Sequence, residues 1–285
     1  MDPRLTDLLR LLELEQLEVN LFRGESRDTG STQVFGGQVL SQALTAAYAT
    51  VDPRRMVHSL HAYFLRRGDF NARIVYSVDR SRDGQSFSNR RIVAIQHGEP
   101  IFNMTASFQV MEPGLEHQLE MPDVPPPEAL PDQASLSPEL MEKLPERMQR
   151  FLKRPTPFEF RHVQSFDVWQ SVSAPPRRQG WLKSVEALPD DEALHRCLLA
   201  YVSDVHLLGT TLLPHGGVAS TERTIMASID HAMWFHRRVR VDDWLLYDID
   251  SPSASGARGF ARANLYTRDG VLVASTAQEG LIRRV

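Results

Sequence analysis

LHAYFLRR, residues 60–67, is a strand-like run, and a related run appears far downstream as DHAMWFHR, residues 230–237. The match aligns His61 with His231, an offset of 231 − 61 = 170. Both runs mix aromatic and small apolar residues, a composition that suits a β-strand. A repeat at this spacing suggests that the chain contains the same structural unit twice.

Two further pairs of segments keep the same order and nearly the same offset. IFNMTASFQ begins at Ile101 and VLVASTAQE at Val271, and 271 − 101 = 170. SFSNR begins at Ser86 and GFARA at Gly259, and 259 − 86 = 173. We therefore predict a duplicated unit, a helix followed by an antiparallel sheet. Pairing two such units extends the sheet and buries the surface that one unit leaves open.

Each unit is expected to hold one apolar helix ahead of its strands. In the first unit, residues 36–51 (GGQVLSQALTAAYATV) place small and apolar residues at helical spacing. In the second, residues 197–210 (CLLAYVSDVHLLGT) suit a buried helix but contain Asp204. On a continuous helix this carboxylate would share its face with the residues three and four positions away, Ala200, Tyr201, Leu207 and Leu208.

A proline-rich stretch separates the two units. Seven prolines fall between Pro122 and Pro145, a composition typical of a partly extended linker. We place the N-terminal unit at residues 1–120, the proline-rich linker at 121–155 and the C-terminal unit at 156–285.

Composition limits the class of protein. With 36 acidic and 32 basic side chains the net charge is −4, so the chain has no overall attraction to nucleic acid. Its single cysteine, Cys197, excludes an internal disulfide and fits a reducing compartment. No apolar run approaches the roughly 18 residues of a membrane span, and the acidic N-terminus does not look like a signal peptide. We expect a cytoplasmic protein without a nucleic-acid partner or a membrane span.

Common cofactor and nucleophile patterns are missing from the sequence. His58, His61, His231 and His236 have spacings of three and five, which on strands do not put a pair on one face, so we expect packed or hydrogen-bonded histidines and no metal. No G-x-S-x-G, G-x-G-x-x-G or P-loop pattern occurs. Cys197 has no partner to activate its thiol. We expect no cofactor.

Several motifs in order resemble the type II acyl-CoA thioesterases: FGGQVLSQAL (35–44), SFSNRRIVAIQHG (86–98), YVSDVHLLGT (201–210), ASIDHAMWFHR (227–237) and ASTAQEG (274–280). The similarity runs from about residue 5 to the end. It implies an α+β fold, a double hotdog in which two antiparallel sheets, each wrapped around a central helix, are fused in tandem. It also implies hydrolysis of fatty acyl-CoA to free fatty acid and coenzyme A.

Matched motif by motif, the family's catalytic Asp, hydroxyl and Gln fall on Asp204, Ser228 and Gln278. The hydroxyl is often Thr in the family, and Ser keeps the hydroxyl but loses the methyl that restricts a Thr rotamer. In the first unit, the position equivalent to Gln278 is Phe108, since 278 − 108 = 170. The polar trio is therefore expected only in the second unit, with the first unit as scaffold and acyl-pocket wall.

These three side chains suit attack by an activated water on a thioester. Asp204 can accept a proton from water, and the amide of Gln278 can hold and direct the same water. Ser228 can donate to Asp204 or bridge to the water. No covalent enzyme intermediate is needed. Burial should raise the pKa of Asp204 and hydrogen bonds should lower it, and the sequence leaves the balance open.

Residues of the second unit are also expected to bind the substrate. The candidates for the apolar wall of the acyl channel are Leu207, Leu208, Met233, Trp234 and Phe235. The candidates for contact with the phosphates of coenzyme A are Arg237, Arg238, Arg240, Arg258 and Arg262.

Two other functions remain open at this point. A hotdog enoyl-CoA hydratase or dehydratase would carry His five residues after the Asp, and here that position is Gly209. A non-catalytic acyl-CoA-binding protein would not need an intact polar trio. Because hotdog units commonly associate, we also expect a homo-oligomer, either a dimer or a tetramer.

Overall fold

The structure is a computed structural model that describes residues 1–28, 33–132, 142, 149, 156–164, 173–216 and 224–284. The first half contains α1 (Pro3–Leu12), β1 (Glu15–Glu18), β2 (Leu21–Gly24), α2 (Gly36–Tyr48), β3 (Arg55–Phe64), β4 (Ile74–Asp83), β5 (Phe87–Gln96) and β6 (Glu99–Val110). The second half contains β7 (Phe158–His162), β8 (Arg177–Ser184), α5 (Glu192–Ser203), η3 (Leu208–His215), β9 (Thr224–Ser228), β10 (Asp230–Phe235), β11 (Leu245–Ser255), β12 (Arg258–Thr267) and β13 (Leu272–Arg284). A short 3-10 helix, η1 (Pro127–Ala129), lies between the halves.

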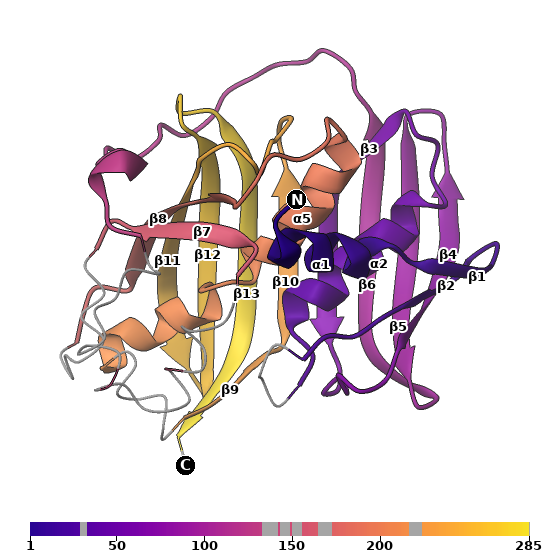
Figure 1. Cartoon of the computed structure of the whole chain (residues 1–285), viewed down its shortest axis with the longest axis horizontal. Coiled ribbons are helices and arrows are strands. Elements are labelled where there is room, and N and C mark those ends of the chain that lie inside the picture. The colour runs from indigo at the N-terminus through magenta and orange to yellow at the C-terminus, as the bar shows by residue number, and fades with distance from the viewer. Residues whose placement is uncertain are drawn as a thin grey trace.

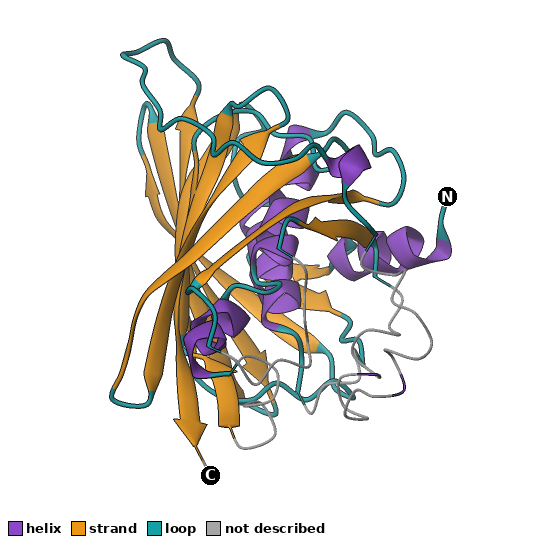
Figure 2. Cartoon of the chain, turned by 90° about the vertical axis from the view of Figure 1, so that its left-hand side faces the viewer, coloured by secondary structure: helices purple, strands orange, loops and turns teal. Residues whose placement is uncertain are grey.

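The described strands form one continuous antiparallel sheet (Figure 1). Their order is β1-β2-β4-β5-β6-β3-β10-β13-β12-β11-β8-β7, with β9 paired to β13. The two halves join where β3 pairs with β10 and Tyr63 stands opposite Asp230. Figure 2 shows the helices gathered on one side of this curved sheet. The expected double hotdog is confirmed, and its two sheets are continuous with each other.

The internal repeat identified the correct strands but not the correct register. β3 and β10 contain the two repeated runs, and they pair with each other at the centre of the sheet. His231 is 1% exposed on the inner face, whereas His61 is exposed on the outer face, where its ring packs edge-on against Trp234. Side chains alternate between the two faces of a strand, so structurally equivalent residues must lie on the same face. His61 and His231 lie on opposite faces, so the offset of 170 that aligned them is wrong by an odd number of residues.

The helix α5 is shorter than the sequence predicted. It ends at Ser203, and Asp204 is the residue that caps its C-terminus. Two residues later His206 adopts a φ of 66°, a left-handed conformation that a continuing helix does not tolerate. Asp204 therefore does not lie on an apolar helix face with Leu207 and Leu208. It lies at the helix end.

Small residues let the two central helices approach closely. α2 is buried along nearly its whole length, and it packs against α5 at the centre of the molecule. A Cβ added at Gly37 would lie 2.2 Å from the carbonyl oxygen of Tyr201, so only glycine fits there. The alanines of α2 are buried, and the helix contacts strands of the first half as well as α5.

The first part of the proline-rich stretch is packed on the second half of the sheet. The Trp181 Nε1–H donates to the carbonyl of Pro125 at 2.9 Å, and Arg161 Nη1 donates to that of Pro127 at 2.8 Å. Met121, Val124 and Leu130 cover a small apolar cluster that is separate from the main core and consists of Trp181, Leu246, Tyr266 and Leu272. Residues 133–155, except 142 and 149, lie outside the described residues, so the limits of the linker stay a prediction.

Among the described residues, one stretch, 192–215, is long and apolar enough by composition to cross a membrane. In the fold it comprises α5 and η3, and 67% of its most apolar window is buried. Core helices of soluble proteins pass the same test, so the stretch is weak evidence for a span.

We expect Gly37→Ala to destabilise the fold by about 1–3 kcal/mol, the usual cost of overpacking. The new methyl would clash with Tyr201 and with the ring of Phe35. Thermal unfolding followed by circular dichroism measures the effect. Gly209→Ala is the matched control, because a Cβ there meets no atom within 4 Å. Equal midpoints for the two variants would contradict the close packing of α2 on α5.

Candidate active site

Asp204 lies where the end of α5 meets the start of α2. The backbone N–H of Gly37 donates to Asp204 Oδ2 at 3.0 Å. Phe35, the N-cap residue of α2, has no side chain that caps the helix. Asp204, which belongs to the second unit, thus accepts from one of the unpaired amides at the start of α2 in the first unit. The positive end of the α2 dipole favours the negative charge of this carboxylate.

Gln278 connects Asp204 to Ser228. It points inward from β13 with no exposed surface, and its Nε2 donates to Asp204 Oδ1 at 2.7 Å and to Ser228 Oγ at 3.1 Å. Ser228 is the last residue of β9 and pairs with Gly280 of β13, which brings its hydroxyl next to the amide. The three residues singled out in the sequence therefore meet. In the described part of the chain no hydrogen bond joins Ser228 directly to Asp204, because Gln278 stands between them.

The pKa of Asp204 reflects its burial. Its side chain is only 6% exposed, and loss of water raises the pKa above its ordinary value of 3.8. The hydrogen bonds from Gln278 and from the Gly37 N–H lower it, but they do not outweigh desolvation. This resolves the balance that the sequence left open. A carboxylate with a raised pKa is a stronger base than an ordinary Asp.

A buried histidine borders the trio. The Nδ1 atom of His231 lies 3.3 Å from Gln278 Nε2 and 3.9 Å from Asp204 Oδ1. The second distance would count as an ion pair if the ring were charged. However, burial lowers the pKa of His231 to about 3. Since Nδ1 also faces an N–H donor, the ring is neutral. The sequence placed this residue only as a packed or hydrogen-bonded histidine.

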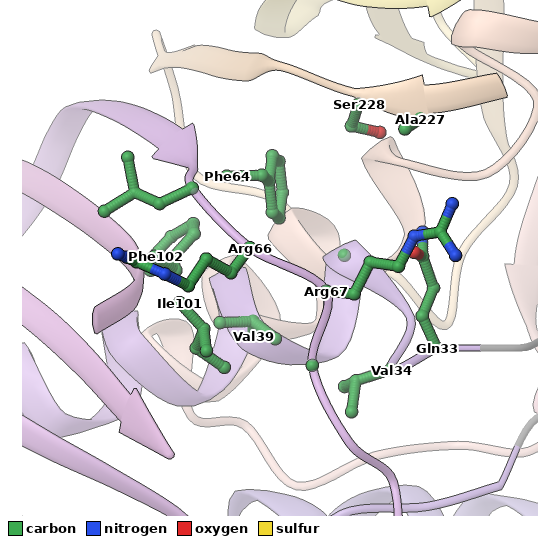
Figure 3. A pocket seen from close by; sticks show the side chains of 13 residues that line it. Gln33, Val34, Val39, Phe64, Arg66, Arg67, Ile101, Phe102, Ala227 and Ser228 are labelled. Carbon is green, nitrogen blue, oxygen red and sulfur yellow. The ribbon is translucent and has the colours of Figure 1, made fainter. Parts of the chain in front are cut away.

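A cavity of about 240 Å³ that is open to solvent lies beside Ser228. Figure 3 shows Ser228 on one side of it, with Phe64 between Ser228 and the apolar side chains of Val39, Ile101 and Phe102. Gly36 also lines the cavity, and a Cβ there would lie 2.8 Å from Asp204 Oδ2, so the carboxylate lies next to this glycine. Asp204 and Gln278 are not themselves among the residues that line the cavity. The remaining lining residues are Gln33, Val34, Leu65, Arg66, Arg67, Gly68 and Ala227.

The apolar residues proposed from the sequence as the acyl-channel wall do not line this cavity. Met233 and Phe235 point inward from β10 into the packed core, and Leu207 is fully buried there as well. Leu208 packs over Gly280. Trp234 points to the outer face of the sheet and is 38% exposed. Strand alternation separates Trp234 from its two neighbours, and the cavity takes its wall mainly from the first unit.

The five arginines proposed for the phosphates are all engaged elsewhere. Each forms an ion pair with an acidic partner: Arg237 with Glu116, Arg238 with Asp190, Arg240 with Asp190 and Asp242, Arg258 with Glu279, and Arg262 with Asp250. None of them lines the cavity. The arginines at the cavity are instead Arg66 and Arg67, which end the first repeated run, LHAYFLRR. No sequence signal set these two arginines apart, because Arg-Arg pairs also occur elsewhere in the chain, including at Arg237-Arg238.

The described residues contain no group of three or more His, Cys, Asp or Glu side chains that could hold a metal ion. His58 bonds to Ser107 at 2.8 Å and His236 to Ser275 at 3.0 Å. Cys197 is buried, and burial raises the pKa of its thiol to about 12, so it is a poor nucleophile.

Comparison with known proteins identifies the family of the chain. A family model described as acyl-CoA thioesterase matches residues 157–281, and a model of the acyl-CoA thioesterase N-terminal domain matches residues 25–109. The chain is 41% identical over 283 residues to acyl-CoA thioesterase 2 of Haemophilus influenzae, covering 99% of each.

Solved structures give the same result. The acyl-CoA thioesterase II TesB2 of Mycobacterium marinum superposes with a TM-score of 0.81 at 44% identity, covering 98% of each chain. A hot dog fold protein of unknown function from Alicyclobacillus acidocaldarius, 18% identical and covering 98% of each chain, superposes with a TM-score of 0.77, which supports the fold alone. The chain therefore belongs to the acyl-CoA thioesterase family of thioester hydrolases.

Proposed function

We propose that this protein hydrolyses fatty acyl-CoA to free fatty acid and coenzyme A through a water molecule activated by Asp204 and aligned by Gln278 and Ser228. The observation that carries the proposal is the hydrogen-bonded chain Asp204–Gln278–Ser228 at the edge of an apolar cavity. A buried carboxylate with a raised pKa beside such a cavity suits a general base.

The reaction needs one proton acceptor and one donor, and Asp204 can serve as both. Its carboxylate takes a proton from water as the water oxygen attacks the thioester carbonyl carbon. The tetrahedral intermediate then expels the thiolate as the carbon–sulfur bond breaks, and the proton held by Asp204 passes to the sulfur. The products are a fatty acid and free coenzyme A. General base catalysis contributes about 10²–10⁴-fold to the rate.

The oxyanion of the intermediate needs a hydrogen-bond donor. The start of α2 offers backbone amides at the positive end of a helix dipole, directly beside Asp204. The Gly37 N–H already donates to Asp204. We assign the oxyanion to the Gly36 N–H, since Gly36 lines the cavity and has no side chain to obstruct the carbonyl.

The cavity suggests how the substrate lies. Val39, Phe64, Ile101 and Phe102 give it an apolar floor for the acyl chain. Arg67 lines the same cavity and forms no ion pair within the described residues, which leaves its charge available to a phosphate of coenzyme A. Arg66 is partly engaged, because it pairs with Glu99 at 3.1 Å.

We also propose a homo-oligomer, a dimer or tetramer, that works in the cytoplasm. At the join of the two half-sheets the outer face exposes Trp234 at 38% and Tyr63 at 54%, and exposed aromatic side chains of this kind favour association. The buried, unpaired Cys197 suits a reducing compartment. A monomer in light scattering at micromolar concentration would contradict the proposed oligomer. Finding the protein secreted, in cell fractionation, would contradict the proposed cytoplasmic location.

Palmitoyl-CoA in the presence of a thiol reagent tests the activity. Wild-type protein should release free thiol, and Asp204→Asn should lower kcat by about 10²-fold or more, because it removes the base but keeps the shape of the side chain. In the wild type, kcat should decrease as the pH is lowered, with the midpoint of the decrease above pH 3.8, since Asp204 must be ionised to accept the proton.

Binding of acyl-CoA to Asp204→Asn, measured by calorimetry, is the control that separates lost chemistry from lost folding. Turnover near the wild-type level in this variant would contradict the assigned role. Binding by the wild type without release of thiol would indicate an acyl-CoA-binding protein, and addition of water to crotonyl-CoA without release of thiol would indicate a hydratase.

Arg67→Ala should raise the KM for palmitoyl-CoA about three- to tenfold and leave kcat nearly unchanged, since it removes one exposed contact to a phosphate. Steady-state kinetics at low ionic strength measures the change. Arg262→Ala is the matched control, because Arg262 is also exposed to solvent but pairs with Asp250 away from the cavity. Equal KM values for the two variants would place the phosphates elsewhere.

A further inference from the structure

His231 takes no part in the proton transfers described above, yet its ring touches the amide that aligns the water. We propose that His231 is a positioning residue that fixes the amide of Gln278, with its N–H groups toward Asp204 and its carbonyl oxygen toward the reacting water. This inference rests on the proposed roles of Asp204 and Gln278 and adds the group that holds one of them in place.

The hydrogen bonds of His231 fix its tautomer. Its Nε2 lies 3.0 Å from the hydroxyls of both Ser203 and Thr276. The hydroxyl of Ser203 donates to the carbonyl of Ala200, and that of Thr276 donates to the carbonyl of Ala232. Each hydroxyl donates its one proton there, so Nε2 faces two acceptors that share its single N–H. Nε2 therefore carries the ring proton, and Nδ1 is an acceptor.

An acceptor at Nδ1 determines which way the amide of Gln278 faces. Three acceptors surround Nε2 of Gln278 and share its two protons: Asp204 Oδ1 at 2.7 Å, Ser228 Oγ at 3.1 Å and His231 Nδ1 at 3.3 Å. A reversed amide would bring its carbonyl oxygen against a carboxylate and against the lone pair of Nδ1, two repulsive contacts. His231 thus adds to the preference that Asp204 alone would give.

The carbonyl oxygen of Gln278 is left without a partner. Gln278 Oε1 is buried and accepts no hydrogen bond from the described part of the chain. A buried acceptor without a partner costs free energy unless something donates to it. A water that gives one proton toward Asp204 and the other toward Gln278 Oε1 would be held with its lone pair free for attack.

The neutral state of His231 is part of this arrangement. The ring is 1% exposed, so a proton on Nδ1 would carry a charge into the core. It would also remove the acceptor that Gln278 uses. The ring is held between β13, through Thr276, and the end of α5, through Ser203, whose carbonyl accepts from the hydroxyl of Tyr247. These contacts connect the helix that carries Asp204 with the strand that carries Gln278.

A double-mutant cycle on kcat tests the proposal. His231→Leu should lower kcat at least about tenfold with little change in KM, because it frees the amide without touching the substrate. In a Gln278→Ala background the same substitution should cost almost nothing, since there is no amide left to position. Equal losses in the two backgrounds would overturn the proposal. Wild-type turnover in Gln278→Ala would instead refute the proposed role of Gln278 itself.

Two conservative variants give a second test that does not depend on His231→Leu folding. In His231→Asn, Oδ1 stands near the position of Nδ1 and can accept from Gln278. In His231→Gln, the amide reaches Ser203 and Thr276 but offers nothing at Nδ1. We expect His231→Asn to keep a higher kcat than His231→Gln, even if its thermal midpoint is lower. A kcat that follows the midpoint in both variants would mean that the histidine is only structural.

Discussion

The hydrogen bond from the Gly37 N–H to the carboxylate of Asp204 is the contact on which the rest of the site depends. It joins the start of one unit's helix to the end of the other's, at a point where only glycine lets the two helices approach. It also brings a buried negative charge to the positive end of a helix dipole, which partly offsets the cost of desolvating it. Because the donor and the acceptor come from different units, neither unit could form this site alone.

Each half of the duplicated fold has a central helix, α2 or α5, and the two helices begin differently. α5 begins with its own cap, since the side chain of Asp191 accepts from the amides of Ala193 and Leu194. α2 has no cap of its own and takes one from Asp204. At the other end of the helix pair the space is filled. Tyr48 packs edge-on against Phe108 at 5.0 Å, and Arg196 donates to the carbonyl of Val57. Of the two central helices, α2 is therefore the one whose start takes part in the candidate site.

Features that depend on the type and order of residues were predicted from the sequence. Features that depend on which face of a strand a side chain occupies, or on where the backbone turns, were missed. The duplication, the small-residue helix and the meeting of Asp204, Ser228 and Gln278 were visible in residue types and order. The end of α5 was not, because the positive φ of His206 has no signal in residue type. The similarity of the two runs aligned His61 with His231, but an error of one residue in such an alignment exchanges the two faces of a strand. The arginines were chosen because they cluster in the strands and turns of the second unit, and clustering in the sequence does not reveal that all five are paired with acidic residues.

The central claim is that Asp204 acts on water and does not itself attack the thioester. A single turnover of palmitoyl-CoA by unlabelled enzyme in H₂¹⁸O tests this most directly, with mass spectrometry of both the product and the protein. Attack by water predicts that the released palmitate carries one ¹⁸O and that the peptide containing Asp204 stays unlabelled. Unlabelled palmitate together with ¹⁸O in the side chain of Asp204 would show an acyl-aspartate intermediate and contradict the account.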